Sequence, residues 1–560
     1  MAVLTLLGLI GCGGGAPLPL PTRPEPRPTR IGIVPPPGPY NQSYDAVHYG
    51  ITLTLPDTGK FITATARIRL VLRDPQRDTL SLDLTGMRVL SVTAQMRGDE
   101  PDDVAFEQDS ARVHIDLPGG RRFNDTIQVV VNYNGEPDDG LIIRKNVHGA
   151  WGAFGDNWPD RARFWMPVID HPSDKATVEF EVRASPQWEV VANGTRRGES
   201  VVDSTGKRVS RWRIDQPIPT YLMVIGATNF AIGTIDRCAQ AGNVPPHPDG
   251  CVPVSSWSFP QDSANAARIF RRGGQMVTYY SNLVAPFPYA ELAHVQSSTR
   301  FGGMENAGAI FYSEQAIAGG TLGEGTVSHE TAHQWFGDAV TPGHWSDLWL
   351  SEGFATYFGN LFFEHADGVQ RFREVTANSW RGYLQSQVKD LAIVDSVRTP
   401  GNDLLQLLNA NSYNKGGAVL HMARGLLGDS VFFGGIRRYY GRFAHGTART
   451  PDLRRALEEQ AGRDLGWFFD QWVYRPGHPV LNVSHTWDAA SAEVIVTIEQ
   501  TQKAEWPTFR FPLELGFTVN GSEVRHRTEV AARRQTARFR LASAPTAFRV
   551  DPDGWLLHER

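Results

Sequence analysis

Residues 327–355 read VSHETAHQWFGDAVTPGHWSDLWLSEGFA, and this stretch decides how the centre of the chain must fold. On a helix, residues four positions apart project from the same face, so His329 and His333 can approach one metal ion. Glu330 follows the first imidazole and can reach a water molecule on such an ion. The pattern His-Glu-x-x-His therefore predicts a zinc-binding helix.

A third metal ligand is expected at Glu352. Eighteen residues separate it from His333, and the turn Thr341-Pro342-Gly343 lies between them, so a second helix can fold back against the first. Two imidazoles and one carboxylate leave the fourth position of a tetrahedral zinc open for water, which is typical of a catalytic site. The competing interpretation, two helices packed only through aromatic residues, leaves these ionisable groups without a partner among Trp335 and Phe354.

The patterns outside this stretch predict a multidomain α+β protein. Alternating or clustered apolar residues indicate strands at 51–55, 64–72, 127–133 and 177–182, and again at 494–499, 508–519 and 537–542. Helical patterns cover 326–338, 348–364, 416–427 and 452–460. We expect an N-terminal antiparallel β domain at 40–235, a mainly helical catalytic domain at 236–477 and a small C-terminal β-sandwich at 478–560.

Composition excludes one class of partner. The 560 residues include 55 Lys and Arg against 60 Asp and Glu, for a formal net charge of −5, and no long basic run occurs. A nucleic-acid surface would need concentrated positive charge, so no nucleic-acid partner is expected. The length exceeds what one hydrophobic core serves, which agrees with several domains.

The first 39 residues form a segment of their own. Residues 1–11 are apolar but too short to cross a bilayer as a helix, and they run into Cys12. Residues 9–12 (LIGC) resemble a bacterial lipoprotein signal, in which the cysteine carries the lipid, and a Pro-rich tether follows at 17–39. We expect a lipid-anchored protein of the bacterial cell envelope or periplasm, with the membrane contacted only through Cys12. Plain secretion and an unprocessed N-terminus are the alternatives.

Two further cysteines, Cys238 and Cys251, flank a Gly- and Pro-rich segment. In an oxidising compartment a disulfide between them is expected, and two unpaired buried thiols are the alternative.

Four motifs together resemble the gluzincin aminopeptidases, the group of aminopeptidase N and leukotriene hydrolase. They are the zinc motif with its distant glutamate, the sequence GGMEN at 302–306, SYNKGGA at 412–418, and FFDQW at 468–472 with the following RPG. Weaker likeness extends over 44–479, which is most of the chain. The resemblance implies a thermolysin-like catalytic domain with one Zn²⁺ per chain.

The resemblance also implies roles for individual residues. The segment of Gly302, Gly303, Met304, Glu305 and Asn306 would bind a peptide with a free N-terminus. Within it, Glu305 would pair with the α-ammonium group, while the two glycines let the substrate backbone approach. Tyr413 would stabilise the oxyanion that forms when water attacks the carbonyl, with Glu330 as general base.

Some positions depart from the family pattern or carry a weaker expectation. Many relatives hold the α-ammonium with a second Glu or Gln, and the matching position here is Trp158. Either Asp156 or Asn157 substitutes, or the pocket is more aromatic and Glu305 acts alone. Lys415 is expected to be solvated or ion-paired.

The chain ends in the predicted β-sandwich, so we expect no large C-terminal helical domain and a more open site. Two hypotheses compete with an aminopeptidase. One is an endopeptidase on the same scaffold, and the other is a surface-anchored binding protein with a vestigial site.

Overall fold

The computed structural model describes residues 43–97, 99–239, 250–395 and 403–560. The chain divides into two units, Met1–Pro39 and Tyr40–Arg560. The predicted lipidation site Cys12 and its tether lie outside the described residues. No helix in the described part of the chain combines the length and the apolar character needed to span a membrane.

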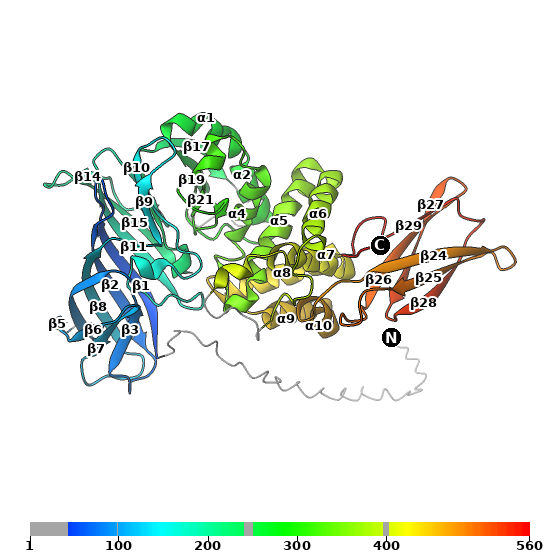
Figure 1. Cartoon of the computed structure of the whole chain (residues 1–560), viewed down its shortest axis with the longest axis horizontal. Helices are drawn as coiled ribbons and strands as arrows, with labels where there is room; N and C mark the ends of the chain where they lie inside the picture. Colours follow the sequence, from blue (N-terminus) through cyan, green and yellow to red (C-terminus); the bar gives the residue numbers. More distant parts are fainter. Residues whose placement is uncertain (1–42, 98, 240–249, 396–402) are drawn as a thin grey trace, which may run out of the picture. The chain divides into compact units, whose positions relative to one another are not determined.

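The N-terminal domain is built from strands (Figure 1). Its large sheet contains β1 (Tyr44–Thr54), β2 (Ile62–Leu72), β4 (Arg88–Met96), β5 (Asp102–Asp103), β8 (Thr126–Gly135), β11 (Lys175–Ala184), β13 (Thr195–Arg196), β14 (Val201–Val202) and β15 (Arg208–Pro219). The order is β13-β15-β11-β1-β2-β8-β4-β5, with β14 beside β15. Alternating burial along β11 shows why this segment forms a strand: every second residue enters the core.

Two smaller sheets complete this domain. One contains β9 (Leu141–Lys145), β10 (Trp151–Gly155), β12 (Glu189–Ala192) and β16 (Ile225–Thr228), in the order β12-β16-β10-β9. The other contains β3 (Thr79–Asp83), β6 (Phe106–Gln108) and β7 (Arg112–Asp116), in the order β3-β7-β6.

The central domain begins with a five-stranded sheet. Its strands are β17 (Ala231–Ala239), β18 (Val252–Ser258), β19 (Leu292–Ser297), β20 (Gly303–Met304) and β21 (Ala309–Ser313). The order is β17-β18-β19-β21-β20, which leaves β20 as an edge strand.

Helices make up most of the rest of the central domain (Figure 1). They are α1 (Ser263–Ile269), α2 (Gly273–Leu283), α3 (Glu314–Ala318), α4 (Glu324–His333), α5 (Trp349–Asp367), α6 (Val369–Leu384), α7 (Gly416–Leu427), α8 (Asp429–Phe443), α9 (Thr450–Ala461) and α10 (Gly466–Val473). A π-helical turn at Asn411–Lys415 precedes α7, and the short strands β22 (Val340–Pro342) and β23 (Gly446–Ala448) pair in parallel.

The C-terminal domain is a pair of three-stranded sheets. One contains β24 (Leu481–Asp488), β25 (Glu493–Gln500) and β28 (Arg534–Arg540), and the other contains β26 (Phe511–Val519), β27 (Ser522–Val530) and β29 (Ala547–Val550). The rings of Phe517 and Phe539, one from each sheet, lie 6.2 Å apart. This order of β domain, mainly helical domain and small β-sandwich confirms the predicted fold class.

Two local predictions are corrected. The large N-terminal sheet is not wholly antiparallel, because β1 and β11 pair in parallel. Alternation of apolar residues marks a strand but not the direction of its neighbour. The helix expected at 326–338 spans Glu324–His333, because the backbone N–H groups of Gln334 and Trp335 donate to the carbonyl oxygens three residues before them and not four.

Candidate metal centre

Three side chains from α4 and α5 bring their donor atoms together at one point. Nε2 of His329 lies 3.0 Å from Nε2 of His333, and Oε2 of Glu352 lies 3.2 and 3.3 Å from these two nitrogens. Ligands placed about 2.0–2.1 Å from a tetrahedral zinc are separated from one another by roughly 3.3 Å. The triangle therefore fits one zinc ion and leaves the fourth position for a small ligand.

Glycines let the neighbouring helices approach closely enough to form this triangle. A Cβ atom on Gly359 of α5 would lie 3.3 Å from the backbone N and Cα of His329 on α4. A Cβ atom on Gly353 would lie 2.9 Å from the backbone of Gly416, where α7 begins. Larger side chains at these positions would push α5 away from its neighbours, so the glycines help to fix the spacing of the metal ligands.

Hydrogen bonds orient the imidazole of His333. Its Nδ1 lies 3.0 Å from the carbonyl oxygen of Phe336 and 3.1 Å from Oγ of Ser351. Because a carbonyl oxygen only accepts, Nδ1 carries the proton and Nε2 presents its lone pair to the metal position. The role of Ser351 was not predicted, although this residue directly precedes Glu352 in the sequence.

Two further carboxylates, those of Glu305 and Glu330, lie beside His333. Donor atoms of Glu305, Glu330 and His333 all lie within 4.8 Å of one another, and all three residues are buried. Burial raises the pKa of Glu305 to about 7 and that of Glu330 well above its ordinary value. Cations placed among these carboxylates would offset the cost of burying them.

The predicted peptide-binding segment forms the edge of the five-stranded sheet. Gly303 and Met304 pair with Tyr312 and Phe311 of β21, and the outer side of β20 has no neighbouring strand. Such an edge can pair with an extended peptide. The Cα of Gly302 faces open space, whereas the side chain of Met304 is buried in the core.

Two buried polar side chains beside the site, those of Asn306 and Asp338, have surroundings that the sequence did not predict. The amide of Asn306 and the carboxylate of Asp338 have no hydrogen-bond partner within the described ranges. Burial and the charge of Glu305 raise the pKa of Asp338 well above its ordinary value. The ammonium group of Lys175 donates instead to the backbone oxygens of Asp338 and Ala339, each at 3.0 Å.

Tyr413 reaches the metal triangle from the π-helical turn. Its ring stacks on the imidazole of His329, with centroids 5.9 Å apart and planes 13° from parallel. Burial and the nearby carboxylate of Glu352 raise the pKa of Tyr413 well above its ordinary value. The hydroxyl therefore stays protonated and can donate a hydrogen bond at the metal position.

Asp156 and Asn157 are engaged elsewhere. The carboxylate of Asp156 lies 3.1 Å from Nε of Arg300 and accepts a hydrogen bond from Oγ1 of Thr299 at 3.0 Å. Nδ2 of Asn157 donates to the carbonyl oxygen of Met223 at 2.6 Å. Neither side chain is available as a second partner for an ammonium group.

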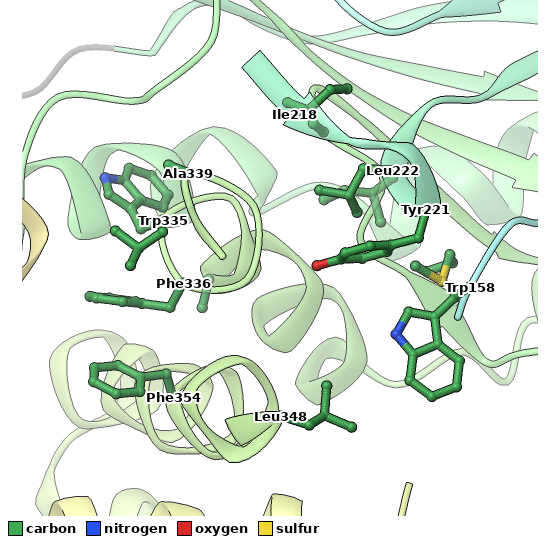
Figure 2. Close-up of a cluster of buried hydrophobic side chains, with 14 of the residues drawn as sticks. Trp158, Ile218, Tyr221, Leu222, Trp335, Phe336, Ala339, Leu348 and Phe354 are labelled. Atoms are coloured by element: carbon green, nitrogen blue, oxygen red, sulfur yellow. The ribbon is translucent and has the colours of Figure 1, made fainter. Parts of the chain in front are cut away.

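Trp158 takes part in an aromatic cluster instead. Its ring lies 6.1 Å from that of Phe301 and 5.6 Å from that of Trp345, which in turn lies 5.5 Å from the ring of Tyr221. Figure 2 shows Trp158 and Tyr221 near each other, with the Tyr221 hydroxyl directed toward the turn after α4, where it donates to the carbonyl oxygen of Gly337. The surroundings of Trp158 are therefore aromatic.

Three further polar residues, Asp347, His344 and Lys415, lie near the motifs in the sequence. Asp347 accepts a hydrogen bond from Oγ1 of Thr450 at 2.6 Å, and so ties the start of α5 to α9. Nδ1 of His344 pairs with Oγ of Ser346. Lys415 is not solvated or ion-paired: it is 0% exposed and has no carboxylate partner among the residues that the structure describes.

A groove of about 330 Å³ opens beside His329. It runs between α4, α5 and α6 and is lined by Gly325, His329, Thr356, Gly359, Asn360, Phe363, Arg371, Val375, Asn378 and Ser379. None of these lining residues is acidic, whereas the carboxylates of Glu305 and Glu330 lie beside His333.

Cys238 and Cys251 form a disulfide, with Cα atoms 4.8 Å apart. The bond connects β17 to the residue before β18, at the edge of the five-stranded sheet that is farthest from β20.

Comparison with known families gives two matches. Residues 272–472 match the Peptidase family M1 domain, and residues 45–222 match the Peptidase M1 N-terminal domain. Together the two matches cover more than half of the chain.

Curated relatives are 26–28% identical to the chain over the aligned residues. Leucyl aminopeptidase of Saccharolobus solfataricus is 26% identical over 483 residues, which cover 81% of this chain and 56% of the relative. Probable aminopeptidase 2 of Sulfurisphaera tokodaii is 28% identical over 348 residues, 58% of this chain and 41% of the relative. Glutamyl aminopeptidase of Sus scrofa is 27% identical over 345 residues, which cover 59% of this chain and 35% of the relative. The matched part of the chain thus spans about half the length of these relatives or less.

Proposed function

Because the chain belongs to the peptidase M1 family, we propose that it is a zinc-dependent aminopeptidase that removes the N-terminal residue of peptides. One observation carries the proposal. A triangle of donor atoms suited to zinc lies next to a buried carboxylate, Glu305, that can hold a substrate's α-ammonium group. Metal and ammonium sites so close together fit an enzyme that cuts only the first peptide bond.

His329, His333 and Glu352 would hold the zinc ion. Zinc bound there would act as a Lewis acid, which polarises a carbonyl oxygen and lowers the pKa of a bound water molecule. The proton released by the attacking water passes to Glu330, which is buried beside His333, and then to the leaving amine. Tyr413, held protonated next to His329, donates a hydrogen bond to the oxyanion.

Glu305 selects the substrate's free amino end. A carboxylate in an apolar pocket forms a strong charge-assisted hydrogen bond with an ammonium group, and an acylated amine cannot replace that partner. Since Asp156 and Asn157 are engaged elsewhere, Glu305 acts alone, and the aromatic cluster around Trp158 favours apolar surfaces nearby.

The direction of the bound peptide follows from the place of Glu305 beside His333. The amino end lies at Glu305 and β20, so the residues after the cleaved bond extend past His329. The groove between α4, α5 and α6 offers them about 330 Å³.

The proposed place of action is the bacterial cell envelope, with Cys12 as the lipid-bearing residue and secretion as the alternative. Support comes from the LIGC sequence at 9–12 and from the disulfide between Cys238 and Cys251, since disulfides persist in oxidising compartments.

The substitution Glu330→Gln tests the proposal. It preserves the size of the side chain and removes the base, so turnover of leucine p-nitroanilide should fall by about 10²- to 10⁴-fold. Zinc content, measured by atomic absorption, should stay at one ion per chain because the three ligands are intact. The matched control is Glu324→Gln in the first turn of the same helix, where the partly buried side chain pairs with Arg272.

Two outcomes contradict the proposal. A Glu330→Gln protein that keeps wild-type turnover would exclude Glu330 as the base. Cleavage of N-acetyl-leucine p-nitroanilide as fast as the free-amine substrate would favour an endopeptidase instead.

A further inference from the structure

The five residues of the π-helical turn, Asn411–Lys415, divide into one side chain that faces the metal position and four that anchor the turn. Asn411 donates to the carbonyl oxygen of Val388 at 3.0 Å, and Ser412 to that of Leu407 at 2.8 Å. Asn414 donates to the carbonyl oxygen of Ser379 at 2.9 Å, and Lys415 to that of Arg475 at 3.2 Å.

Tyr413 is the exception in this turn. Its ring stacks on His329, which is a predicted metal ligand. Each of the other four side chains therefore binds a different backbone carbonyl oxygen, while Tyr413 faces the metal position. A π-helical turn is rare and occurs frequently at functional sites, where it sets the direction of a side chain.

Lys415 is the anchor that is costly to bury. It is 0% exposed, and its ammonium group has one carbonyl acceptor and the face of Tyr383, 5.8 Å from the ring centroid. No carboxylate pairs with it in the described part of the chain. An apolar side chain of similar size would fill the same space without removing a charge from water, so packing alone does not explain a lysine here.

The acceptor of Lys415 is itself held firmly. Arg475 begins the linker to the C-terminal domain, and the linker residue Gly477 is held from both sides. Its carbonyl oxygen accepts a hydrogen bond from the Tyr383 hydroxyl at 3.3 Å. The indole of Trp506 covers it so closely that Gly477 has no room for a Cβ atom. Trp506 in turn donates to the carboxylate of Asp390 at 2.8 Å.

We infer that Lys415 is a positioning residue for Tyr413: by binding the carbonyl oxygen of Arg475 it fixes the turn so that the Tyr413 hydroxyl meets the oxyanion. This inference rests on the proposed function. It adds that the linker to the C-terminal β-sandwich helps to set the geometry of the reaction.

A double-mutant cycle tests the inference with leucine p-nitroanilide and zinc-loaded protein. Lys415→Met should lower kcat at least tenfold and leave KM within twofold, because the misplaced hydroxyl serves the transition state and not substrate binding. In a Tyr413→Phe background the same substitution should change kcat by less than twofold, since the hydroxyl it positions is already gone. A purely structural role would give independent, multiplying losses.

Two further measurements accompany the cycle. Hydrogen exchange of the backbone amides of residues 411–415, followed by mass spectrometry, should be faster in Lys415→Met. The control Lys389→Met removes a partly exposed lysine near the same linker and should change neither exchange nor kcat. If Lys415→Met does not fold, Tyr383→Phe replaces it, because this substitution removes the hydrogen bond to the carbonyl oxygen of the linker residue Gly477. It should give a smaller loss of kcat than Lys415→Met. That loss should again vanish in the Tyr413→Phe background.

The outcomes separate the two claims. A wild-type protein that cleaves no aminoacyl substrate would overturn the proposed function and this inference with it. An active wild type whose Lys415→Met variant keeps a normal kcat, or whose losses multiply in the double variant, would overturn the inference alone.

Discussion

Gly303 lies directly against the carboxylate of Glu330, so that a Cβ atom on Gly303 would overlap the Oε1, Cδ and Cγ atoms of that side chain. The edge strand that is expected to bind the peptide and the proposed base are therefore in contact. A methyl group at Gly303 must displace one of them.

Gly303→Ala should thus lower kcat with little loss of folding stability. Moving a base by about 1 Å can cost about 10²-fold in rate, and we expect a decrease of that order for leucine p-nitroanilide. The control is Gly441→Ala on α8, where an added Cβ meets no atom within 4 Å. Equal kcat values for Gly303→Ala and the wild type would show that Glu330 can move without consequence.

Glu305→Gln should abolish most of the preference for a free amino end. Asp156 and Asn157 are bound to other groups, so no second side chain at these positions can take over the ammonium. Losing a hydrogen bond between charged groups costs about 1.5–3 kcal/mol, which predicts a fall of about 10- to 150-fold in kcat/KM. N-acetylated peptides, whose slow cleavage should not change, serve as the control. A fall of less than threefold would mean that another group holds the amine.

The metal triangle could be predicted from the sequence because a helix fixes its own side-chain directions. Residues four apart share a face whatever surrounds them, and the imidazoles of His329 and His333 do meet. The third ligand, Glu352, could be predicted because a turn separates it from His333 and lets a second helix fold back against the first. The angle between the two helices could not be predicted, because it depends on the contact of Gly359 with the backbone of His329.

Other features depend on residues far apart in the sequence. Alternation identified β1 and β11 as strands but not their parallel pairing, since the pattern of a strand is the same in both directions. The acceptor of Lys415 lies 60 residues farther along the chain, so nothing near Lys415 distinguished a buried anchor from a solvated side chain. The hydrogen bond of Ser351 to His333 likewise exists only once α4 and α5 pack together.

Gly337→Ala should weaken zinc binding. An added Cβ would lie 2.9 Å from Nδ1 of His333 and 2.5 Å from Oγ of Ser351, so it would disturb the hydrogen bonds that orient this ligand. Such supporting contacts are commonly worth 10- to 100-fold in metal affinity, and we expect a loss in that range from competition with a chelator.

The matched control is Gly428→Ala. Both glycines have a positive φ, so both substitutions strain the backbone, but a Cβ on Gly428 meets no atom within 4 Å. Equal zinc affinities for the two variants would indicate that His333 tolerates the crowding.

Lys175 should make the contact between the N-terminal and central domains depend on pH. Its ammonium group, on β11, donates to the backbone oxygens of Asp338, Ala339 and Gly446, each at 3.0 Å. Burial lowers the pKa of Lys175 from 10.5 to about 7. Between these values the unfolded chain binds the proton more strongly than the folded protein does.

The sign of the effect follows from this difference. Stability rises with pH wherever the unfolded state binds more protons, so Lys175 should add to the free energy of unfolding as pH increases from 7 toward 10.5, by at most about 1.4 kcal/mol per pH unit. Subtracting the urea-unfolding free energy of Lys175→Met from that of the wild type isolates this term. The difference should be flat below pH 7 and rise above it, whereas the same subtraction for the exposed Lys145→Met should stay flat. A difference that falls with increasing pH would mean that the three carbonyl groups stabilise the charged ammonium more than burial destabilises it.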